Sequence, residues 1–344
     1  MSEDEFEEDD DDDLAEGISD NEDLTPHIVT VAHGTQERVK QSQPIIKNTV
    51  TQSLESSSSA RNIQTLISGP KFEYKPLPLS GTFIFDHRTD RKLIDESIPK
   101  NADFKCRTEL LDQNDIEFIK QFVIEHFVKE SNIMRHLRIK DEELIELIHP
   151  LVDRWIKCEN SIVIKHKKKI IGTAFGSLHT SEEFEELYRG QLFHENPQFV
   201  NKDDYAEDIK NGPFKSLNNS RVAVLLNELE WQTGKFLPKG IQKFGELTVI
   251  HPNYYRFGFA TSTAAVLPKI MFSQGCTHDG GDCVAMGTYR MSKRFYSETL
   301  FSMPYDRYFE NGKPVFQKMY DEATAAHFVF FDYAKNKLRP KYVK

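Results

Sequence analysis

Two periodicities alternate along the chain between residues 102 and 335, one with the spacing of helices and one with the spacing of strands. Apolar residues that recur at every third and fourth position predict helices that begin near the candidate caps Asp112 or Asp115, after Asp141, after Ser220, at Thr261 and at Met291. Runs of β-branched and aromatic residues predict strands at 104–108, 161–166, 170–178, 247–250, 282–289 and 326–333. The resulting order, β-α-α-β-β-α-β-α-β-α-β, indicates an α/β (α+β) domain in which helices cover a sheet.

Proline, glycine and charged residues interrupt this pattern or mark its ends. Pro150 and Pro268 fall inside predicted helices and are expected to bend them. Gly275 follows the fourth helix and suits a C-terminal cap. Residues 167–169, three lysines, join two strands as a hairpin, whereas the polar stretch 180–219 has little regular pattern and is predicted to be an insertion.

Composition separates an N-terminal tail from the folded part. Only 38% of the residues are hydrophobic, and the first 24 residues carry 14 acidic side chains with no Lys or Arg. We interpret residues 1–70 as a disordered acidic and Ser-rich tail, 71–101 as an extended arm and 102–340 as the folded domain. The tail is expected to aid solubility; the alternative is a phosphorylated segment or one that docks basic partners.

The charge balance excludes one class of partner. Removing the 14 tail acids from the 54 in the chain leaves 40 against 44 Lys and Arg, so the formal charge of −10 becomes +4 for the remainder. A mildly basic body suits a polyanionic cofactor and argues against a strongly basic nucleic-acid binder.

Cysteine usage and hydropathy bear on the compartment. The four cysteines form no framework of close pairs, which favours a reducing environment. No apolar run reaches the length of a membrane span, and the acidic N-terminus is unlike a signal or transit peptide. The expected location is the cytosol, with the nucleus as the alternative, and no membrane partner is expected.

The stretch Glu246–Thr261 carries the clearest candidate chemistry. A β-branched run at 247–250 is stopped by His-Pro-Asn at 251–253, and a helix begins after Gly258 and Ala260. The N–H groups of a helix start lack partners within the helix and bind phosphate groups, and small residues let the phosphates approach the backbone. The stretch is neither a Walker loop nor a dinucleotide-binding fingerprint, and an ordinary βα turn is the plain alternative.

This stretch resembles the acetyl-coenzyme A loop of the GNAT acetyltransferases, Gln/Arg-x-x-Gly-x-Gly/Ala. Residues 255–260 fit it, except that Tyr255 stands at the Gln/Arg position and the arginine comes one residue later. The order of elements over residues 102–335 also matches that fold, with its mixed, twisted central sheet flanked by helices. The resemblance implies acetyl-CoA as co-substrate, without a metal, and a cofactor-binding set of Thr248, Val249, Ile250, Tyr255, Arg256, Phe257, Gly258, Phe259, Ala260 and Thr261.

Three further segments resemble the insect-type arylalkylamine (dopamine) N-acetyltransferases and their nematode relatives. They are His126–Glu130 at the end of the first helix, Thr288–Ser292 at a strand-to-helix junction, and the Asn-Gly hairpin within 305–316. The sequence departs from that group where Ser131 follows the glutamate in place of proline, where Thr288 replaces a serine, and where Leu300 replaces a glycine before Phe301.

The resemblance implies roles for five residues. Glu130 would be the general base that takes the proton of the amine, with Glu246 at the start of the central strand as the alternative. Thr288 and Ser292 would orient water or the amine, and Tyr296 would protonate the departing sulfur. The plain interpretations are a surface glutamate for Glu130 and a core aromatic for Tyr296.

Other interpretations remain open at this stage. Residues 276–283 contain two cysteines, a histidine and two aspartates, but lack zinc-ligand spacing, and their Gly-Gly pair is expected to form a turn. For function, the leading expectation is an N-acetyltransferase of small amines. The alternatives are a protein lysine acetyltransferase and a non-catalytic protein of the same fold that binds coenzyme A or a partner.

Overall fold

The computed structural model describes residues 82–99, 101–179, 183–184, 187–192, 194–237, 246–250, 257–295 and 297–335, with the backbone alone for 128–130 and 246–250. Its strands are β1 Leu93–Ser97, β2 Cys106–Leu110, β3 Ile162–His166, β4 Lys169–Gly176, β5 Glu246–Ile250, β6 His278–Cys283, β7 Glu298–Pro304, β8 Phe309–Glu310, β9 Lys313–Pro314 and β10 Ala325–Asp332. Its helices are α2 Ile116–Glu130, α3 Asn132–Leu137, α4 Asp141–Lys157, α6 Ala206–Lys210, α7 Leu217–Thr233, α8 Phe259–Ser273 and α9 Met286–Arg294, with short 3₁₀ turns η2 Gln113–Asp115 and η4 Tyr305–Arg307. The tail predicted for residues 1–70 lies outside the described residues.

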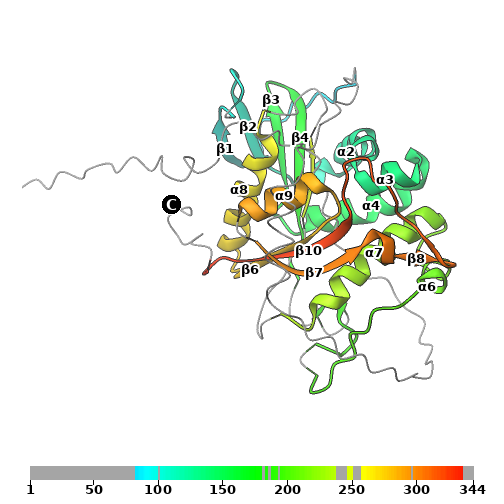
Figure 1. Ribbon diagram of the computed structural model, residues 1–344. Helices are drawn as coiled ribbons and strands as arrows, with labels where there is room; N and C mark the ends of the chain where they lie inside the picture. Colours follow the sequence, from blue (N-terminus) through cyan, green and yellow to red (C-terminus); the bar gives the residue numbers. More distant parts are fainter. Residues whose placement is uncertain are drawn as a thin grey trace, which may run out of the picture.

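The strands form two main sheets, with helices packed against them (Figure 1). The first has the order β1-β2-β3-β4-β5 and the second the order β6-β10-β7, and every ladder among the described strands is antiparallel. The predicted α/β architecture with helices around a central sheet is therefore confirmed. The described strands divide that sheet between β5 and β6, so β5 lies at the edge of its own sheet.

Strand β10 is the centre of the second sheet and is buried on both faces. Its six inner residues are all buried, with alternate side chains on opposite faces. This double burial follows from its neighbours, because α7 and α9 both contact it. A strand covered on both faces reads in sequence as a continuous apolar run, which is the pattern of residues 326–331 apart from His327.

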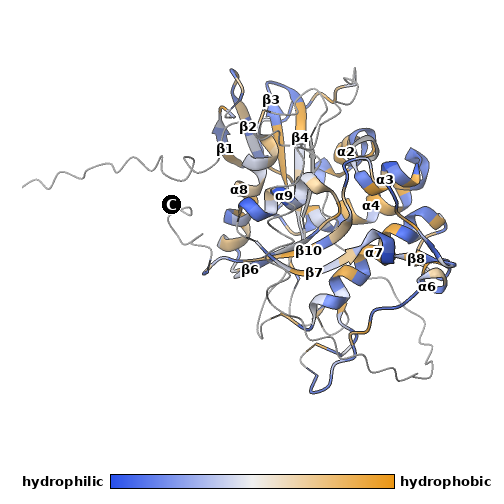
Figure 2. Cartoon of the chain, in the orientation of Figure 1, coloured by the Kyte–Doolittle hydropathy of each residue, from blue (hydrophilic) through white to orange (hydrophobic). Residues whose placement is uncertain are grey.

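The main core lies where α2, α4 and α7 pack against the sheets. The apolar face predicted for the helix after Asp141 is buried in α4, which runs through Pro150. Trp155 of α4 stacks on Phe175 of β4 with ring centroids 5.0 Å apart. Both blue and orange stretches occur along these helices in Figure 2, as expected for helices with one buried face.

The predicted extended arm contains a strand and a buried ion cluster. β1 pairs with β2 at the edge of the first sheet. Just before it, the fully buried guanidinium of Arg91 binds both carboxylate oxygens of Asp115, at 2.9 and 2.8 Å. It also contacts Asp86 and Glu109, which Lys165 contacts from the other side at 2.9 and 3.2 Å. Burial alone raises the pKa of Asp86, but its hydrogen bonds from Arg91, Arg88 and Lys165 outweigh this and lower it to about 2.

The predicted Gly-Gly turn is wrong. Gly280 and Gly281 lie inside β6, opposite Phe330 and Val329 of β10. A Cβ on Gly280 would stand 2.9 Å from the ring of Phe328, so the glycine is needed for close packing of the side chain on the sheet. The strand therefore spans 278–283 in place of 282–289, and the next helix is α9, not 291–300.

Two other boundaries also differ from expectation. Ser216, not Ser220, caps α7 and accepts a hydrogen bond from the N–H of Asn219 at 3.4 Å. Ser220 is buried in the first turn, where its hydroxyl donates to the carbonyl of Phe214 at 3.3 Å. The stretch 180–219, predicted to lack regular structure, contains α6 and the start of α7.

Other local predictions are confirmed. Gly275 has φ 92°, and the N–H groups of Gly275 and Cys276 close the end of α8 on the carbonyls of Phe272 and Met271 at 3.0 and 3.1 Å. The Asn-Gly hairpin is formed by β8 and β9, with positive φ at Asn311 and Gly312. Among the described residues, none of the helices combines the length and the apolar character needed to cross a bilayer.

Candidate active site

The site predicted from sequence begins at strand β5. Its ladder with β4 pairs Thr248 with Ala174, Val249 with Thr173 and Ile250 with Gly172. Among the described strands β5 pairs with β4 alone, so no described strand pairs with its other backbone edge. An edge strand presents N–H and C=O groups that an extended molecule can pair with.

Helix α8 follows β5 and starts at a glycine in the left-handed conformation. Gly258 is its N-cap with φ 91° and ψ 8°, a conformation that L-residues rarely adopt. The first helical bond runs from the N–H of Ser262 to the carbonyl of Gly258 at 3.0 Å. The N–H groups of Phe259, Ala260 and Thr261 therefore belong to the open first turn, the part of a helix that favours anions.

Two phenylalanines on either side of Gly258 hold this turn against the first sheet. Phe257 packs edge-on against Phe104 with centroids 5.3 Å apart, and Phe259 is buried in the same cluster beside Cys106. Because the ring of Phe259 is buried, its main chain alone can meet a ligand, whereas Phe257 is half-buried. The main-chain role predicted for the loop stays a prediction.

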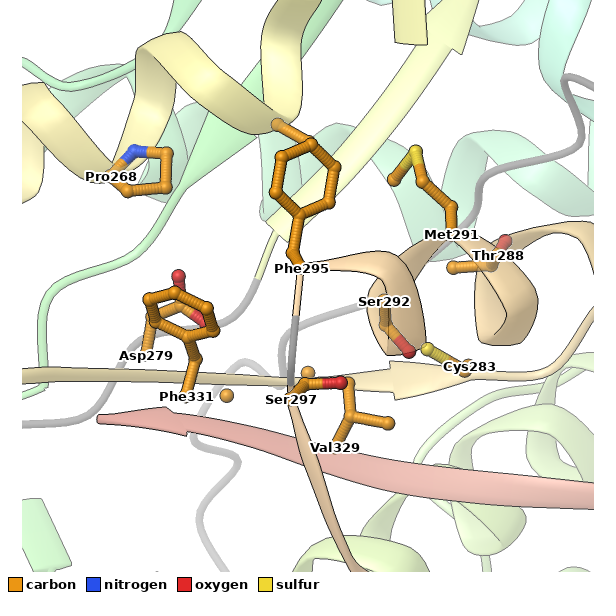
Figure 3. Close-up of a pocket in the computed structure, with 13 residues that line it drawn as sticks. Pro268, Asp279, Cys283, Thr288, Met291, Ser292, Phe295, Ser297, Val329 and Phe331 are labelled. Atoms are coloured by element: carbon orange, nitrogen blue, oxygen red, sulfur yellow. The ribbon is translucent and has the colours of Figure 1, made fainter. Parts of the chain in front are cut away.

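A pocket lies between α8 and α9 over β6 and β10 (Figure 3). Its wall is mostly apolar, with a few hydroxyl, thiol and carboxyl groups, as is usual for small-molecule sites. The lining residues are Ala264, Pro268, Asp279, Gly280, Gly281, Cys283, Thr288, Met291, Ser292, Phe295, Ser297, Val329 and Phe331.

Thr288 and Ser292 both line this pocket from α9. They lie one helical turn apart and so share a face of the helix. Thr288 is buried and Ser292 is half-buried, with its hydroxyl donating to the carbonyl of Tyr289 at 2.8 Å. The two hydroxyls lie inside α9, not at the strand-to-helix junction that the sequence predicted, because α9 begins at Met286.

The other predicted catalytic residues are only partly placed. Glu130 is the last residue of α2, which contacts β5, and Glu246 is the first residue of β5. The backbone alone is described at both positions, so the choice of base between them stays a prediction. Tyr255, Arg256 and Tyr296 lie outside the described residues.

Ser297 and Cys283 are polar residues of the pocket wall that were not predicted as parts of the acetyl-transfer site. Ser297 is buried, and its hydroxyl has no hydrogen-bond partner among the described residues. Cys283, at the end of β6, is also buried in the pocket wall. No local signal marks Ser297, because its place depends on α9 ending at Arg294 and the chain returning beside β10 as β7.

Beneath α9 a set of polar side chains ties the helix to β10 and β7. The ring of Tyr289 stacks on His327 with centroids 3.8 Å apart, and the hydroxyl of Tyr289 contacts that of Thr299 at 3.1 Å. His327 Nδ1 lies 2.7 Å from the hydroxyl of Ser302. Burial, with the nearby charge of Lys293, lowers the pKa of His327 to about 4, so the ring is neutral at neutral pH.

The zinc alternative for residues 276–283 has no geometric support. His278 and Cys283 lie at opposite ends of the extended strand β6, about 16 Å apart along it at the rise of a β-strand. Cys276 packs in a separate apolar cluster with Met271 and Tyr333. Within the described part of the chain no group of three His, Cys, Asp or Glu residues is arranged to hold a metal ion.

Comparisons with known proteins bear on the fold. The sequence matches no protein-family model and no curated protein. The structure resembles the arylalkylamine N-acetyltransferase 2 of Aedes aegypti, with a TM-score of 0.54 and 13% identity over 66% of this chain and 98% of that one. It also resembles the Drosophila melanogaster polyamine N-acetyltransferase that forms N-acetylagmatine, with a TM-score of 0.51 and 12% identity over 66% of this chain and 99% of that one.

The putative arylalkylamine N-acetyltransferase 7 of the yellow fever mosquito gives a TM-score of 0.52 at 11% identity, over 74% of this chain and 99% of that one. The chain has the GNAT acetyltransferase fold. Of the groups predicted from sequence, Thr288 and Ser292 line the pocket between α8 and α9, whereas β5 and the helix start at Gly258 are not part of its lining.

Proposed function

We propose that the chain is an N-acetyltransferase that moves the acetyl group of acetyl-CoA directly to a primary amine, most simply a small arylalkylamine. The observation that carries this proposal is that α8 and α9 face one another across one pocket. The first of these helices begins at the left-handed Gly258, and the second carries Thr288 and Ser292. The pocket is lined by Ala264 and Pro268 of α8, the helix whose start suits phosphate groups, and by the two hydroxyls of α9.

Acetyl-CoA fits the groups that this region offers. The N–H groups of the first turn of α8 suit its pyrophosphate. The free edge of β5, to which alternate residues of the strand point their N–H and C=O groups, suits the amides of the pantetheine arm and the carbonyl of the thioester. The apolar wall made by Pro268, Met291 and Phe295 excludes water from the reacting groups.

Acetyl transfer then needs two proton movements. An alkylamine with a pKa of ~10 is mostly protonated at neutral pH and cannot attack the thioester carbonyl until it loses a proton. Glu130 at the end of α2 would accept that proton, directly or through water held by Thr288 and Ser292. The amine nitrogen bonds to the acetyl carbon and the carbon–sulfur bond breaks; Tyr296 would give its proton to the thiolate and recover one from the attacking nitrogen, which leaves a neutral amide and a free thiol.

Backbone donors supply the charge stabilisation in this scheme. Negative charge builds on the carbonyl oxygen as the amine attacks, and preorganised N–H groups stabilise it more than water does. The N–H groups on the free edge of β5 are held in place by the ladder with β4 on the other side. They therefore reorganise little during the reaction.

Two measurements test the proposal in sequence. Isothermal titration of the full chain with acetyl-CoA should show binding at a single site. Release of free thiol from acetyl-CoA in the presence of a panel of arylalkylamines, polyamines and a lysine-containing peptide then identifies the acceptor. Binding without thiol release for any acceptor would favour a non-catalytic coenzyme A-binding protein, and release with the peptide alone would favour lysine acetylation.

A further inference from the structure

A buried amide links the end of α2 to the start of α9. Helix α2 ends at Glu130, Ser131 makes a single extended step with φ −66° and ψ 121°, and α3 begins at Asn132. The side chain of Asn132 is 1% exposed and its Nδ2 donates to the carbonyl oxygen of Val284 at 3.2 Å. Val284 follows β6 directly and stands two residues before the first residue of α9.

The orientation of this amide is fixed by chemistry. A carbonyl oxygen only accepts hydrogen bonds, so the Asn132 group that faces Val284 must be the NH₂ group. The same oxygen accepts a second hydrogen bond from the hydroxyl of Tyr305 at 2.6 Å. The start of α9 is held further by Asp321, whose Oδ2 accepts from the N–H of Met286 at 2.6 Å.

This bond spans two parts of the proposed site. On one side, Glu130 is two residues before Asn132 at the same sharp bend of the backbone. On the other side, Thr288 is four residues after Val284 and within the first turn of α9. The two segments are 152 residues apart in sequence, and the bond fixes the bend beside Glu130 relative to the helix that carries the hydroxyls.

We infer that Asn132 is a positioning residue of the acetyl transfer, which fixes the backbone that carries Glu130 relative to the helix that carries Thr288 and Ser292. The inference rests on the proposed function and extends it to a residue that touches neither substrate. A general base works only within hydrogen-bond reach of the proton it accepts. A displacement of about 1 Å in a catalytic arrangement can cost about 10²-fold in rate.

The chain offers a matched control for the stability of such a bond. Asn219 on α7 is also buried, and its Nδ2 donates to the carbonyl of Glu143 on α4 at 2.6 Å. In both asparagines Oδ1 has no hydrogen-bond partner among the described residues. Asn219 therefore makes the same kind of hydrogen bond between two elements, but outside the wall of the pocket. Alanine variants of the two asparagines differ chiefly in which segments the lost hydrogen bond had held together.

The test compares Asn132→Ala with Asn219→Ala in the full chain. Both should lower Tm by similar amounts, and both should keep the affinity for acetyl-CoA. Only Asn132→Ala should lower kcat, by about tenfold or more, and move the ascending limb of the pH–rate profile. If Asn132 acts through Glu130, its effect on kcat should disappear when Glu130→Gln is already present.

A second variant covers the case in which Asn132→Ala does not fold. Asn132→Leu fills a similar volume and removes the amide oxygen that lacks a partner among the described residues, so it should be milder for stability and equally damaging to kcat. Unchanged kcat in a folded Asn132 variant, or an equal loss of kcat in Asn219→Ala, would overturn the inference while the proposed function stands. A wild-type chain that releases no thiol with any acceptor would overturn the proposed function and this inference with it.

Discussion

Gly258 offers a sharp test of the cofactor site, because a second glycine at the other end of the same helix has almost the same backbone conformation. Gly258 begins α8 with φ 91°, and Gly275 follows its end with φ 92°. An L-residue in a left-handed conformation costs about 1–2 kcal/mol. Alanine at either position should therefore carry the same conformational penalty, whatever else it does.

The two substitutions differ in what surrounds them. A Cβ at Gly275 would meet no atom within 4 Å, so Gly275→Ala measures the conformational penalty alone. For a domain of this size a loss of 1 kcal/mol lowers Tm by about 2–4 °C, so each variant should lose about 2–8 °C. At Gly258 the new side chain also stands where the pyrophosphate would approach the first turn of α8.

Thermal unfolding and isothermal titration with acetyl-CoA separate the two effects. We expect both alanine variants to lose similar stability, and only Gly258→Ala to lose affinity, by about tenfold or more, or ~1.4 kcal/mol. Gly258→Glu should abolish binding while the domain stays folded, because it adds a negative charge beside the phosphates. Equal affinities in Gly258→Ala and Gly275→Ala would refute the placement of the pyrophosphate at this helix start.

Further tests concern two buried ionisable residues, His327 and Arg91, and the proposed base, Glu130. The pKa of His327 is lowered in the folded state, so between about pH 6.5 and 4 the unfolded chain binds more protons than the folded chain, and the free energy of unfolding falls as the pH falls. Denaturant unfolding should show a loss of about 2 kcal/mol from pH 7 to 5. The His327→Gln variant should not show this loss. Arg91→Met should lower the free energy of unfolding by about 3–5 kcal/mol, because it leaves buried carboxylates without their cation. The control Arg107→Met, at a half-exposed arginine, should lower it by under about 1 kcal/mol. Equal losses in the two variants would mean that burial of the Arg91 cluster does not increase its contribution to stability. Glu130→Gln should lower kcat by about 10²–10⁴-fold and remove the ascending limb of the pH–rate profile, and loss of that limb in Glu246→Gln instead would place the base on β5.

The elements that the sequence predicted well are those whose signals are local. The helix after Asp141 shows one apolar face, and all of that face is buried in α4. Gly275 and the Asn-Gly hairpin adopt positive φ, which only a few residue types tolerate, so their identity alone indicates the turn. The helix start after Gly258 was also predicted from local residues, and Gly258 adopts a left-handed conformation there that was not predicted.

The errors arose where a distant partner decides the structure. Gly280 and Gly281 suit a turn by their own preferences, but the ring of Phe328 on β10 occupies the space beside Gly280 and keeps the pair in a strand. The helix predicted at 291–300 moved with it to α9, and β7 was not predicted. Similarly, Ser220 could cap a helix, yet it is buried behind the turn that Ser216 caps.

The candidate site shows the same division. The loop around Gly258 and the pair Thr288 and Ser292 were marked by short motifs, and the fold brings α8 and α9 to one pocket. Ser297 and Asn132 had no such mark, because a buried serine and a buried asparagine are defined by the segments they meet. Side-chain contacts between segments far apart in the sequence are therefore the part of a site that a single sequence does not predict.

The most direct test of the account is the mass of the amine after incubation with the full chain and acetyl-CoA. At least one small primary amine should gain the mass of a single acetyl group, in amounts equal to the thiol released. The Gly258→Glu variant, at equal concentration and with its fold intact by circular dichroism, should form no acetylated amine. An unmodified amine across the whole panel in the presence of the wild-type chain, or equal product with Gly258→Glu, would contradict the account.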